Sequence, residues 1–416
     1  MVPEGWEIKE LGDVAVFKSG STPSKQQPEY WGDDYPWVSA KDMHCYRIDS
    51  SEVTLTKKGR LRASIAPAGA VLILVRGMTL LKDLPVCYAM KELAFNQDVK
   101  ALIPRNGIDS GFLFFNLLNN KSTILSLVDV AGHGTGRLDT GLLKSLPVSF
   151  PPLPEQTKIA RILSTWDRAI DTTEKLIENS RQQKKSLMQQ LVKGKKRLPG
   201  FEGEWRWQRL GELGATERPA VKAGPFGSSL KKDCYVNRGY KVYGQEQVIS
   251  GDSSVGDYYI SKEKYESLRS CSVLPGDILM SLVGTIGKLL LIPKEAKPGI
   301  INPRLIRISL NSARVIPEFL KYYLETEHAQ NELARRAQGG TMGVLNAGVL
   351  KELHVPLPAV EEQKKINRFI NCLDNVIEQH LKCLRRLRLE KQALMQQLLT
   401  GKRRVKVDEL IPAALT

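Results

Sequence analysis

The sequence contains a long internal repeat, and this repeat constrains the fold more than any local motif does. Residues 155–197 align without a gap on residues 362–404 at an offset of 207, and 18 of the 43 aligned positions are identical. Unrelated sequences would share only a few identical positions over such a length. We therefore expect two copies of one scaffold.

The repeat extends upstream of these two segments, with one change of offset. Near the start the offset is 199, so the second copy carries eight extra residues before its first glycine-anchored strand. The copies share least over residues 13–68 and 212–274, where each copy is expected to perform its own function. The matched pairs are Trp6 with Trp205, Leu11 with Leu210, Gly12 with Gly211, Gly69 with Gly276, Gly77 with Gly284, Gly136 with Gly343, Leu138 with Leu345, Gly141 with Gly348, Leu143 with Leu350, Lys144 with Lys351 and Leu146 with Leu353.

Length and composition are typical of a protein with two domains of ordinary size. No apolar run reaches the 18 or so residues of a membrane span, and the first residues do not resemble a signal peptide, so we expect a cytoplasmic protein without a membrane partner. The six cysteines form no CxxC pair and the five histidines do not cluster with them. The sequence therefore predicts reduced structural thiols and no metal site.

The net charge of +16 is concentrated in the repeated segments. Residues 155–197 hold 11 Lys/Arg against 5 Asp/Glu, and residues 362–404 hold 11 against 4. Charge runs on helices are usually solvated faces of mixed sign with little excess. An excess of this size instead favours an acidic partner, either nucleic acid or an acidic protein surface.

Both basic segments have the apolar spacing of long helices with one narrow apolar seam, which is typical of a coiled-coil partner. Proline-rich stretches precede them, and Gly194 and Gly401 follow, as helix start and stop signals would. The spacing does not decide between parallel and antiparallel pairing. Thr173 and His380 also fall at seam positions, and we interpret His380 as a packing or partner-facing residue. The seam consists of Ile159, Leu163, Trp166, Ile170, Ile177, Leu187 and Leu191 in the first helix, and Ile366, Ile370, Leu373, Ile377, Leu384, Leu394 and Leu398 in the second.

The segments outside the two predicted long helices have the sequence pattern of α/β domains. Short apolar runs at residues 71–75 and 277–283 follow turn residues, as buried strands do, and residues 37–39 and 242–244 predict a second equivalent pair of strands. Residues 112–118 and 319–324 predict matching short helices.

Catalytic motifs are missing. The only Pro-Pro pair follows Phe150, so it cannot form an amino-methyltransferase loop. The GTIGK stretch at residues 284–288 is too short for a phosphate loop and lacks a Ser or Thr after its lysine. Glu362 could belong to a nuclease carboxylate cluster, but an acidic residue is also expected at a helix start. We expect no catalytic residue and no cofactor bound by this chain.

The order of a variable domain, the stretch GTGRLDTGLLKSLPVSFPPLPEQTKIARIL, a basic helix ending in LMQQLVKGKKR, and the same order again resembles the specificity subunit of Type I restriction-modification enzymes. The resemblance covers essentially the whole chain. It implies a DNA-binding subunit with two target-recognition domains, each reading one half of a split site. It also implies two modification (methyltransferase) subunits and restriction/translocase subunits as partners, which would use S-adenosylmethionine, ATP and Mg.

The expected fold class is α/β (α+β), with two similar target-recognition domains separated by two long coiled-coil helices in a pseudo-twofold internal repeat. The predicted limits are 1–150 for the first recognition domain, 151–197 for the central spacer helix, 198–355 for the second recognition domain, 356–404 for the C-terminal spacer helix and 405–416 for a tail.

Candidate DNA-reading residues are polar side chains in the variable stretches and at strand ends. Glutamine can pair with adenine, lysine can donate to guanine and glutamate can accept from cytosine. An ordinary solvated loop would contain the same residue types. Tyr30, Trp31 and Trp37 could stack on an unpaired base, but core packing is the favoured interpretation. The candidates are Lys18, Ser21, Thr22, Lys25, Lys41 and Asp42 in the first copy, and Lys222, Ser228, Ser229, Lys231, Gln245, Glu246 and Gln247 in the second.

Two other classes of protein remain compatible with the sequence. One is a stand-alone, double-headed DNA-binding protein such as a repressor. The other is a self-sufficient DNA-modifying enzyme, which the missing motifs disfavour. The target bases and the spacer length cannot be derived from the sequence.

Overall fold

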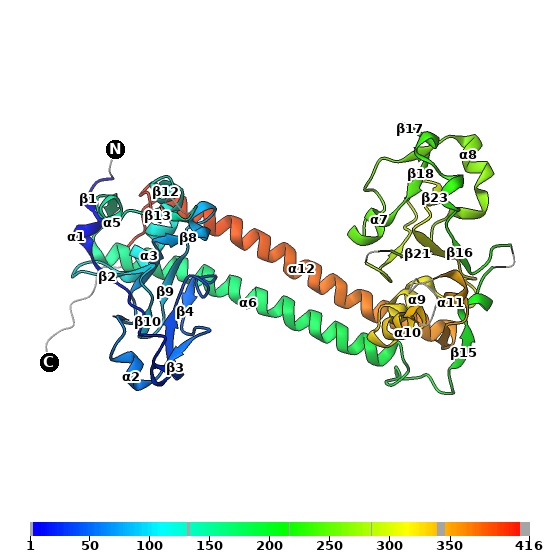
Figure 1. Cartoon of the computed structure of the whole chain (residues 1–416), viewed down its shortest axis with the longest axis horizontal. Helices are drawn as coiled ribbons and strands as arrows, with labels where there is room; N and C mark the ends of the chain where they lie inside the picture. The colour runs from blue at the N-terminus through cyan, green and yellow to red at the C-terminus, as the bar shows by residue number, and fades with distance from the viewer. Residues whose placement is uncertain (1–2, 131–133, 216, 284, 339–345, 408–416) are drawn as a thin grey trace. The chain divides into compact units, whose positions relative to one another are not determined.

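The computed structural model describes residues 3–130, 134–215, 217–283, 285–338 and 346–407. It divides into two compact units, each of which contains one recognition domain and parts of two long helices (Figure 1). The first unit is Met1–Lys175 with Lys382–Thr416, and the second is Leu176–Leu381. Each unit includes segments of both long helices, whereas the predicted limits separate the helices from the recognition domains. The division therefore does not test those limits, which stay a prediction.

The first unit combines short strands with short helices. Its strands are Glu7–Glu10 (β1), Ala15–Ser19 (β2), Trp31–Val38 (β3), Arg47–Ile48 (β4), Thr54–Leu55 (β5), Ile65–Ala66 (β6), Val71–Leu74 (β7), Arg76–Gly77 (β8), Val86–Ala89 (β9), Leu93–Phe95 (β10), Val99–Pro104 (β11), Val128–Val130 (β12), Gly136–Leu138 (β13) and Pro147–Phe150 (β14). Its short helices are Leu11–Val14 (α1), Pro28–Tyr30 (η1), Lys57–Arg60 (α2), Met78–Leu81 (η2), Ser110–Asn119 (α3), Lys121–Leu125 (α4) and Thr140–Lys144 (α5).

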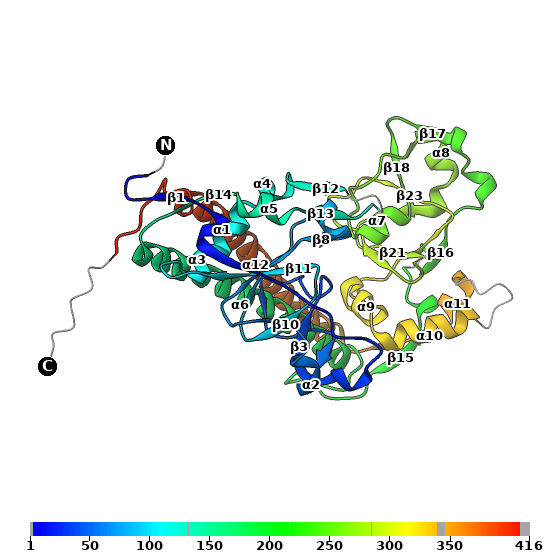
Figure 2. The same ribbon diagram turned by 60° about the vertical axis from the view of Figure 1, so that its left-hand side comes forward.

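The second unit has the same mixture, with α8 and β17 at one end and α9–α11 at the other (Figure 2). Its strands are Arg206–Arg209 (β15), Val221–Ala223 (β16), Tyr235–Val236 (β17), Tyr240–Tyr243 (β18), Tyr259–Ile260 (β19), Ser272–Val273 (β20), Ile278–Ser281 (β21), Leu289–Leu291 (β22), Gly299–Ile301 (β23), Leu305–Ile308 (β24) and His354–Leu357 (β25). Its helices are Leu210–Glu212 (η3), Gly227–Ser229 (η4), Lys232–Cys234 (η5), Gln245–Ser250 (α7), Lys262–Ser267 (α8), Arg269–Cys271 (η6), Pro317–Leu324 (α9), Glu327–Gln338 (α10) and Ala347–Lys351 (α11).

The two larger sheets of the first unit share four consecutive strands each with a sheet of the second unit. The order β2-β11-β7-β9 in the first unit corresponds to β16-β24-β21-β22 in the second. The order β5-β3-β10-β6 corresponds to β19-β18-β23-β20, and in both sheets the β3–β10 or β18–β23 pair is parallel while its neighbours are antiparallel. The prediction of two similar α/β domains is therefore confirmed, including the expected strands and the helices α3 and α9.

The long helices are Leu153–Leu191 (α6) and Val360–Leu398 (α12), each of 39 residues. Both end six residues before the predicted limits. Gly194 and Gly401 each have a φ of +69°, and each donates its N–H to the carbonyl of the last helical residue. The glycine stop signals are thus correct, but the residues after them turn away from the helix instead of extending it.

A buried glutamine at the start of each long helix attaches it to its recognition domain. Gln156 Oε1 accepts the N–H of Asp109 at 2.9 Å, and its Nε2 donates to the carbonyl of Pro151 at 2.8 Å. Gln363 repeats both contacts with Ile316 and Pro358 at 2.8 and 2.9 Å. The proline-rich stretches followed by Glu-Gln therefore do more than start a helix, because they fix where each domain joins it.

Within each unit α6 and α12 run antiparallel. In the first unit Glu155, Asp167 and Glu174 pair with Arg404, Lys391 and Arg388, respectively. The residue numbers increase along α6 while those of the partners decrease, as in an antiparallel pair. In the second unit Lys184 pairs with Asp374, and Arg197 pairs with Glu362. The helix direction that the sequence left open is antiparallel in both units.

The ion pairs at the helix ends repeat across the two copies. Arg404 contacts both carboxylate oxygens of Glu155 at 2.8 and 2.7 Å, and Arg197 contacts those of Glu362 at 2.6 and 2.8 Å. Glu155 and Glu362 are nearly inaccessible to solvent. A buried carboxylate needs such a bidentate partner, and the repeat supplies it in both copies by the same 207-residue offset.

All fourteen predicted seam residues are at least partly buried. The seam ends belong to the domain cores: Ile159, Leu163 and Leu398 join the core of the first unit, whereas Leu191, Ile366 and Ile370 join that of the second. The apolar stripe thus also anchors the recognition domains. No helix among the described residues combines the length and apolar character needed to cross a membrane.

Candidate nucleic-acid interface

Three segments of the second unit meet around Asn302. The N–H of Asn302 donates to the carbonyl of Tyr243 at 2.9 Å, and Gly224 donates to the carbonyl of Leu305 at 3.0 Å. A Cβ on Gly224 would lie 1.9 Å from the oxygen of Asn302, and one on Gly244 would lie 2.9 Å from its Nδ2. Glycine is required at Gly224 because the two backbones approach too closely for a side chain, whereas at Gly244 the nearby atoms belong to the side chains of Asn302 and Gln247.

The first unit repeats this arrangement around Asn96. The N–H of Asn96 donates to the carbonyl of Val38 at 2.9 Å, and Ser21 donates to the carbonyl of Phe95 at 2.9 Å. A Cβ on Gly20 would lie 1.9 Å from the oxygen of Asn96. We call these loop clusters the reading edges: residues 20–25, 39–42 and 96–98 in the first unit, and residues 224–231, 244–247 and 302–304 in the second.

Two predicted lysines occupy equivalent positions beside the reading edges. Lys18 lies opposite Ala101 in the β2–β11 pair, and Lys222 lies opposite Arg307 in the β16–β24 pair. Ala101 and Arg307 correspond because they pair with Leu72 of β7 and Leu279 of β21, which match each other at the 207-residue offset of the repeat. The offset between β11 and β24 is therefore 206. Lys18 and Lys222, which were predicted separately in each copy, therefore occupy equivalent positions in the two domains.

Most other candidates lie on the reading edges with accessible side chains. Thr22 donates its hydroxyl to Gln97 Oε1 at 2.5 Å, and Ser21 Oγ accepts the N–H of Ser64 at 2.7 Å. Gln245 donates its side-chain amide to the carbonyl of Val283. The exposed candidates are Lys18, Lys25, Lys41, Ser228, Lys231 and Glu246, and the half-buried ones are Ser21, Thr22, Lys222, Ser229 and Gln245.

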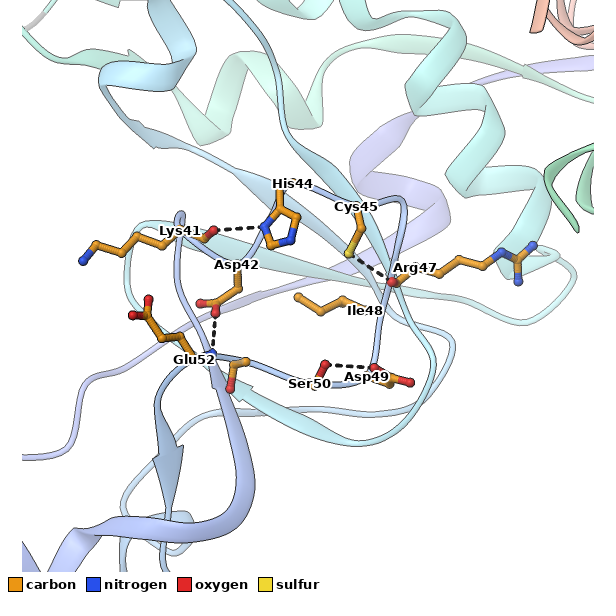
Figure 3. Close-up of a pocket in the computed structure, with 10 residues that line it drawn as sticks. Lys41, Asp42, His44, Cys45, Arg47, Ile48, Asp49, Ser50 and Glu52 are labelled. Carbon is orange, nitrogen blue, oxygen red and sulfur yellow. Dashed lines mark hydrogen bonds between the residues drawn. The ribbon is translucent and has the colours of Figure 1, made fainter. Parts of the chain in front are cut away.

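Asp42 is buried and serves its own loop, unlike an exposed base reader. One carboxylate oxygen accepts the N–H and hydroxyl of Ser39 at 2.8 and 2.9 Å. The other accepts the N–H of Glu52 at 2.7 Å, while the side chain of Lys41 points away from this loop (Figure 3). Three accepted hydrogen bonds leave Asp42 little capacity for a cytosine, and we do not retain it as a reader.

Gln247 is fully buried and caps its own helix. Its Oε1 accepts the N–H of Gly244 at 2.7 Å, and its Nε2 donates to the carbonyl of Val255 at 2.6 Å. A glutamine that satisfies the first turn of α7 in this way cannot also pair with adenine. Sequence alone could not distinguish it from Gln245, two residues earlier, which is accessible.

Phe226 is the residue that sequence reasoning missed. Its side chain is 88 % exposed on the reading edge of the second unit. The signal was present, because a phenylalanine within the Gly, Pro and Ser residues of the stretch AGPFGSS has no core to enter. An exposed aromatic ring on a reading edge can contact a thymine methyl group.

Core packing is the correct interpretation of Trp31 and Trp37. The two rings meet edge to face with centroids 5.2 Å apart, and the Trp37 indole donates to the carbonyl of Ser21 at 3.1 Å. Trp37 is buried, so it is not available for stacking on an unpaired base.

Two features considered in the sequence, a metal site and a phosphate loop, can be compared with the structure. No group of three or more His, Cys, Asp or Glu side chains among those residues is placed to hold a metal ion. In the GTIGK stretch, Gly284 lies outside the described residues. The hydroxyl of Ser281 accepts the N–H of Lys288 at 3.1 Å and donates to the carbonyl of Thr285 at 2.5 Å, so this loop closes on itself.

Comparison with known proteins gives a consistent result. The family model for the Type I restriction modification DNA specificity domain matches twice, over residues 3–179 and 204–384. The specificity subunit of the Type I restriction enzyme MjaVIII from Methanocaldococcus jannaschii is 27% identical over 97% of this chain and 94% of its own length. The specificity subunit of EcoR124I/EcoR124II from Escherichia coli is 34% identical over 39% of this chain and 41% of its own.

Solved structures agree at the level of the fold. The S subunit of the Type-I restriction-modification system from M. genitalium has a TM-score of 0.56 at 17% identity, over 96% of this chain and 99% of that one. A chain from a type I R-M system solved to explain complex assembly and conformational transition has a TM-score of 0.59 at 17% identity, over 97% and 100%.

Proposed function

The chain belongs to the Type I restriction-modification DNA specificity family, and from this premise we propose that each of its two recognition domains reads one half of a bipartite DNA site. It is a DNA sequence-recognition subunit with two such domains. The alternative of a stand-alone repressor-like protein is not favoured, because the family consists of subunits of restriction-modification systems.

The observation that carries the proposal is the contrast between scaffold and loops. The two reading edges share their backbone contacts around Asn96 and Asn302, yet Thr22 stands near the place where the second copy has Phe226. Equal scaffolds with different side chains suit two readers of different sequences.

The readers that we propose are the accessible residues of the reading edges. In the first domain they are Ser21, Thr22, Lys25 and Lys41, joined by Gln97, and in the second they are Ser228, Ser229, Lys231, Gln245 and Glu246, joined by Phe226. Lys18 and Lys222 occupy equivalent positions, so we assign them to contacts common to both halves, such as phosphates.

The chain performs no catalysis in this proposal and binds no cofactor of its own. The family's place in restriction-modification systems supports two modification subunits, which would use S-adenosylmethionine, and restriction/translocase subunits, which would use ATP and Mg. The antiparallel helices α6 and α12 would set the distance between the recognition domains. The limits that we propose are those predicted from the sequence, 1–150 and 198–355 for the recognition domains and 151–197 and 356–404 for the spacer helices. A cytoplasmic location also stays a prediction.

Methylome mapping of paired variants tests the proposal. In cells that carry the chain with its partners, Thr22→Val should alter the methylated motif in one half-site only, and Phe226→Ala should alter the other half only. Arg105→Gln, at an exposed position just after β11 and at the opposite end of that strand from Asp98, is the control and should leave the motif unchanged. A change in both halves from either single variant would refute one reader per domain, and the absence of a co-purified methyltransferase would refute the assignment of partners.

A further inference from the structure

The first recognition domain carries a cluster of four cations that make no ion pair with the acidic residues that the structure describes. Arg76 of β8 and Arg137 of β13 lie directly opposite each other in an antiparallel pair, and both are exposed. Like charges in this position destabilise a sheet. Lys100 of β11 and Lys144 of α5 complete what we call the basic patch, defined as Arg76, Lys100, Arg137 and Lys144.

The two lysines are held in place by their surroundings. Lys100 donates its ammonium to the hydroxyl of Ser19 at 2.6 Å, and the ammonium of Lys144 lies 5.6 Å from the ring centroid of Phe17 on the same strand. Partial burial lowers the pKa of Lys100, and the nearby charges of Lys144 and Arg76 lower it further. The cations are therefore close enough to repel one another.

Two acidic residues lie near Arg137 and offset part of the charge of the patch. Asp129 lies directly opposite Arg137 in the β12–β13 pair. The carboxylate of Asp139 accepts the N–H groups of Gly141 and Leu142 at 2.7 and 3.1 Å, and these bonds, with a smaller contribution from the charge of Arg137, lower its pKa. No member of the patch makes an ion pair with an acidic residue within the described ranges. Four cations with two nearby carboxylates and no ion pair keep a positive charge, which is suited to bind an external anion.

The position of the patch identifies that anion. Ser19 immediately precedes Gly20, and the N–H of Val75, next to Arg76, donates to the carbonyl of Asp98 at 2.8 Å. Gly20 and Asp98 both belong to the reading edge of the first domain, so the patch borders the loops that would face the bases. An anion that lies beside a base reader along a duplex is a backbone phosphate.

We propose that the basic patch binds phosphates of the DNA backbone next to the first half-site, an inference that rests on the proposed function. The contact is independent of sequence, and it positions the first domain on the duplex. Among the described residues the second domain does not repeat the patch: Val283 and Ile306 stand where the first domain has Arg76 and Lys100, and only Lys144 has an equivalent cation, Lys351. The position that matches Arg137 lies outside the described residues.

The test measures how DNA affinity depends on salt. The complex purified from its own cells is titrated with a random 30-base-pair duplex at several salt concentrations, and the variant carries Arg76→Gln, Lys100→Gln and Lys144→Gln together. Each phosphate contact contributes about 0.9 to the slope of log affinity against log salt, so loss of three should lower the slope by about 2.7. The methylated motif should stay the same.

Matched variants separate this role from general charge and folding effects. The triple variant Lys57→Gln, Lys91→Gln and Arg105→Gln removes the same charge from exposed positions of the same unit and should leave the slope unchanged. The charge-retaining variant Arg76→Lys, Lys100→Arg and Lys144→Arg should keep most of the wild-type slope, which a loss of fold would not allow.

Three outcomes would overturn the proposal. The slope of the patch variant could equal that of the wild type, the control variant could lower it as much, or the patch variant could lose its methyltransferase partner while DNA binding stays intact. The last result would identify an acidic protein surface as the occupant. A wild-type complex without a split methylated motif would instead count against the proposed function, independently of the patch.

Discussion

The buried ion pair between Asp167 and Lys391 provides a sharp test of how the long helices are held together. The two side chains are 6% and 9% exposed, and the Lys391 ammonium lies 5.3 and 5.4 Å from the ring centroids of Tyr46 and Phe115. The internal repeat supplies a matched pair in the second unit, because Asp374 corresponds to Asp167 and Lys184 corresponds to Lys391 at the 207-residue offset; the side chains of Lys184 and Asp374 are 24% and 44% exposed. The same chemical change can therefore be made in two environments within one molecule.

The expected costs differ because the environments differ. Asp167→Asn leaves a buried ammonium without an anion, which costs about 3–5 kcal/mol. Asp374→Asn leaves a partly solvated ammonium, and exposed pairs contribute at most about 1 kcal/mol. For a unit of about 200 residues the first change should lower the melting temperature by on the order of 10 °C and the second by about 2–4 °C.

Hydrogen exchange is the appropriate assay because each unit can be followed separately. Asp167→Asn should increase exchange in the segments of α6 and α12 that belong to the first unit, and urea unfolding should report the free energy. The double variant Asp167→Leu with Lys391→Met should recover most of the stability, since an apolar pair of similar volume often replaces a buried ion pair without loss. Equal costs for Asp167→Asn and Asp374→Asn would show that burial does not control these pairs and would refute the reasoning.

Three further predictions follow from the same contacts. Gly224→Ala would place a Cβ 1.9 Å from the backbone oxygen of Asn302, so methylome mapping should show loss of methylation at the site as the second domain stops reading its half, whereas Gly5→Ala, with open space around it, should leave the motif intact despite backbone strain. An insertion of about four residues, near one helical turn of 5.4 Å, should change the non-specific DNA spacer by one or two base pairs when made within α6 between residues 175 and 184. The same insertion after Gly194 should not, because the helix has already ended at Leu191; a spacer unchanged by both insertions would show that the helices do not set the distance. Burial raises the pKa of Cys87 to about 12, so its thiol stays protonated at pH 8 and should resist iodoacetamide, whereas mass spectrometry should find the exposed Cys372 modified.

The sequence determined the features that depend on local pattern or on comparison of the chain with itself. The duplication, the two long helices, the strands around residues 71–75 and 277–283 and the stop signals at Gly194 and Gly401 were all predicted correctly. Each of these rests on neighbouring residues or on a constant offset. The equivalence of Lys18 and Lys222, however, required the strand registers, because the offset changes within the variable stretch.

The tertiary structure decided the features that depend on residues far apart in the chain. Glu155 and Arg404 are 249 residues apart, and only the path of the chain makes them partners and makes the helices antiparallel. Asp42 and Gln247 have the composition of readers but are buried, while Gln245 and Phe226 are accessible. Residue type sets what a side chain can bind, but its exposure depends on which other segments pack over it, and periodicity carries no record of that packing.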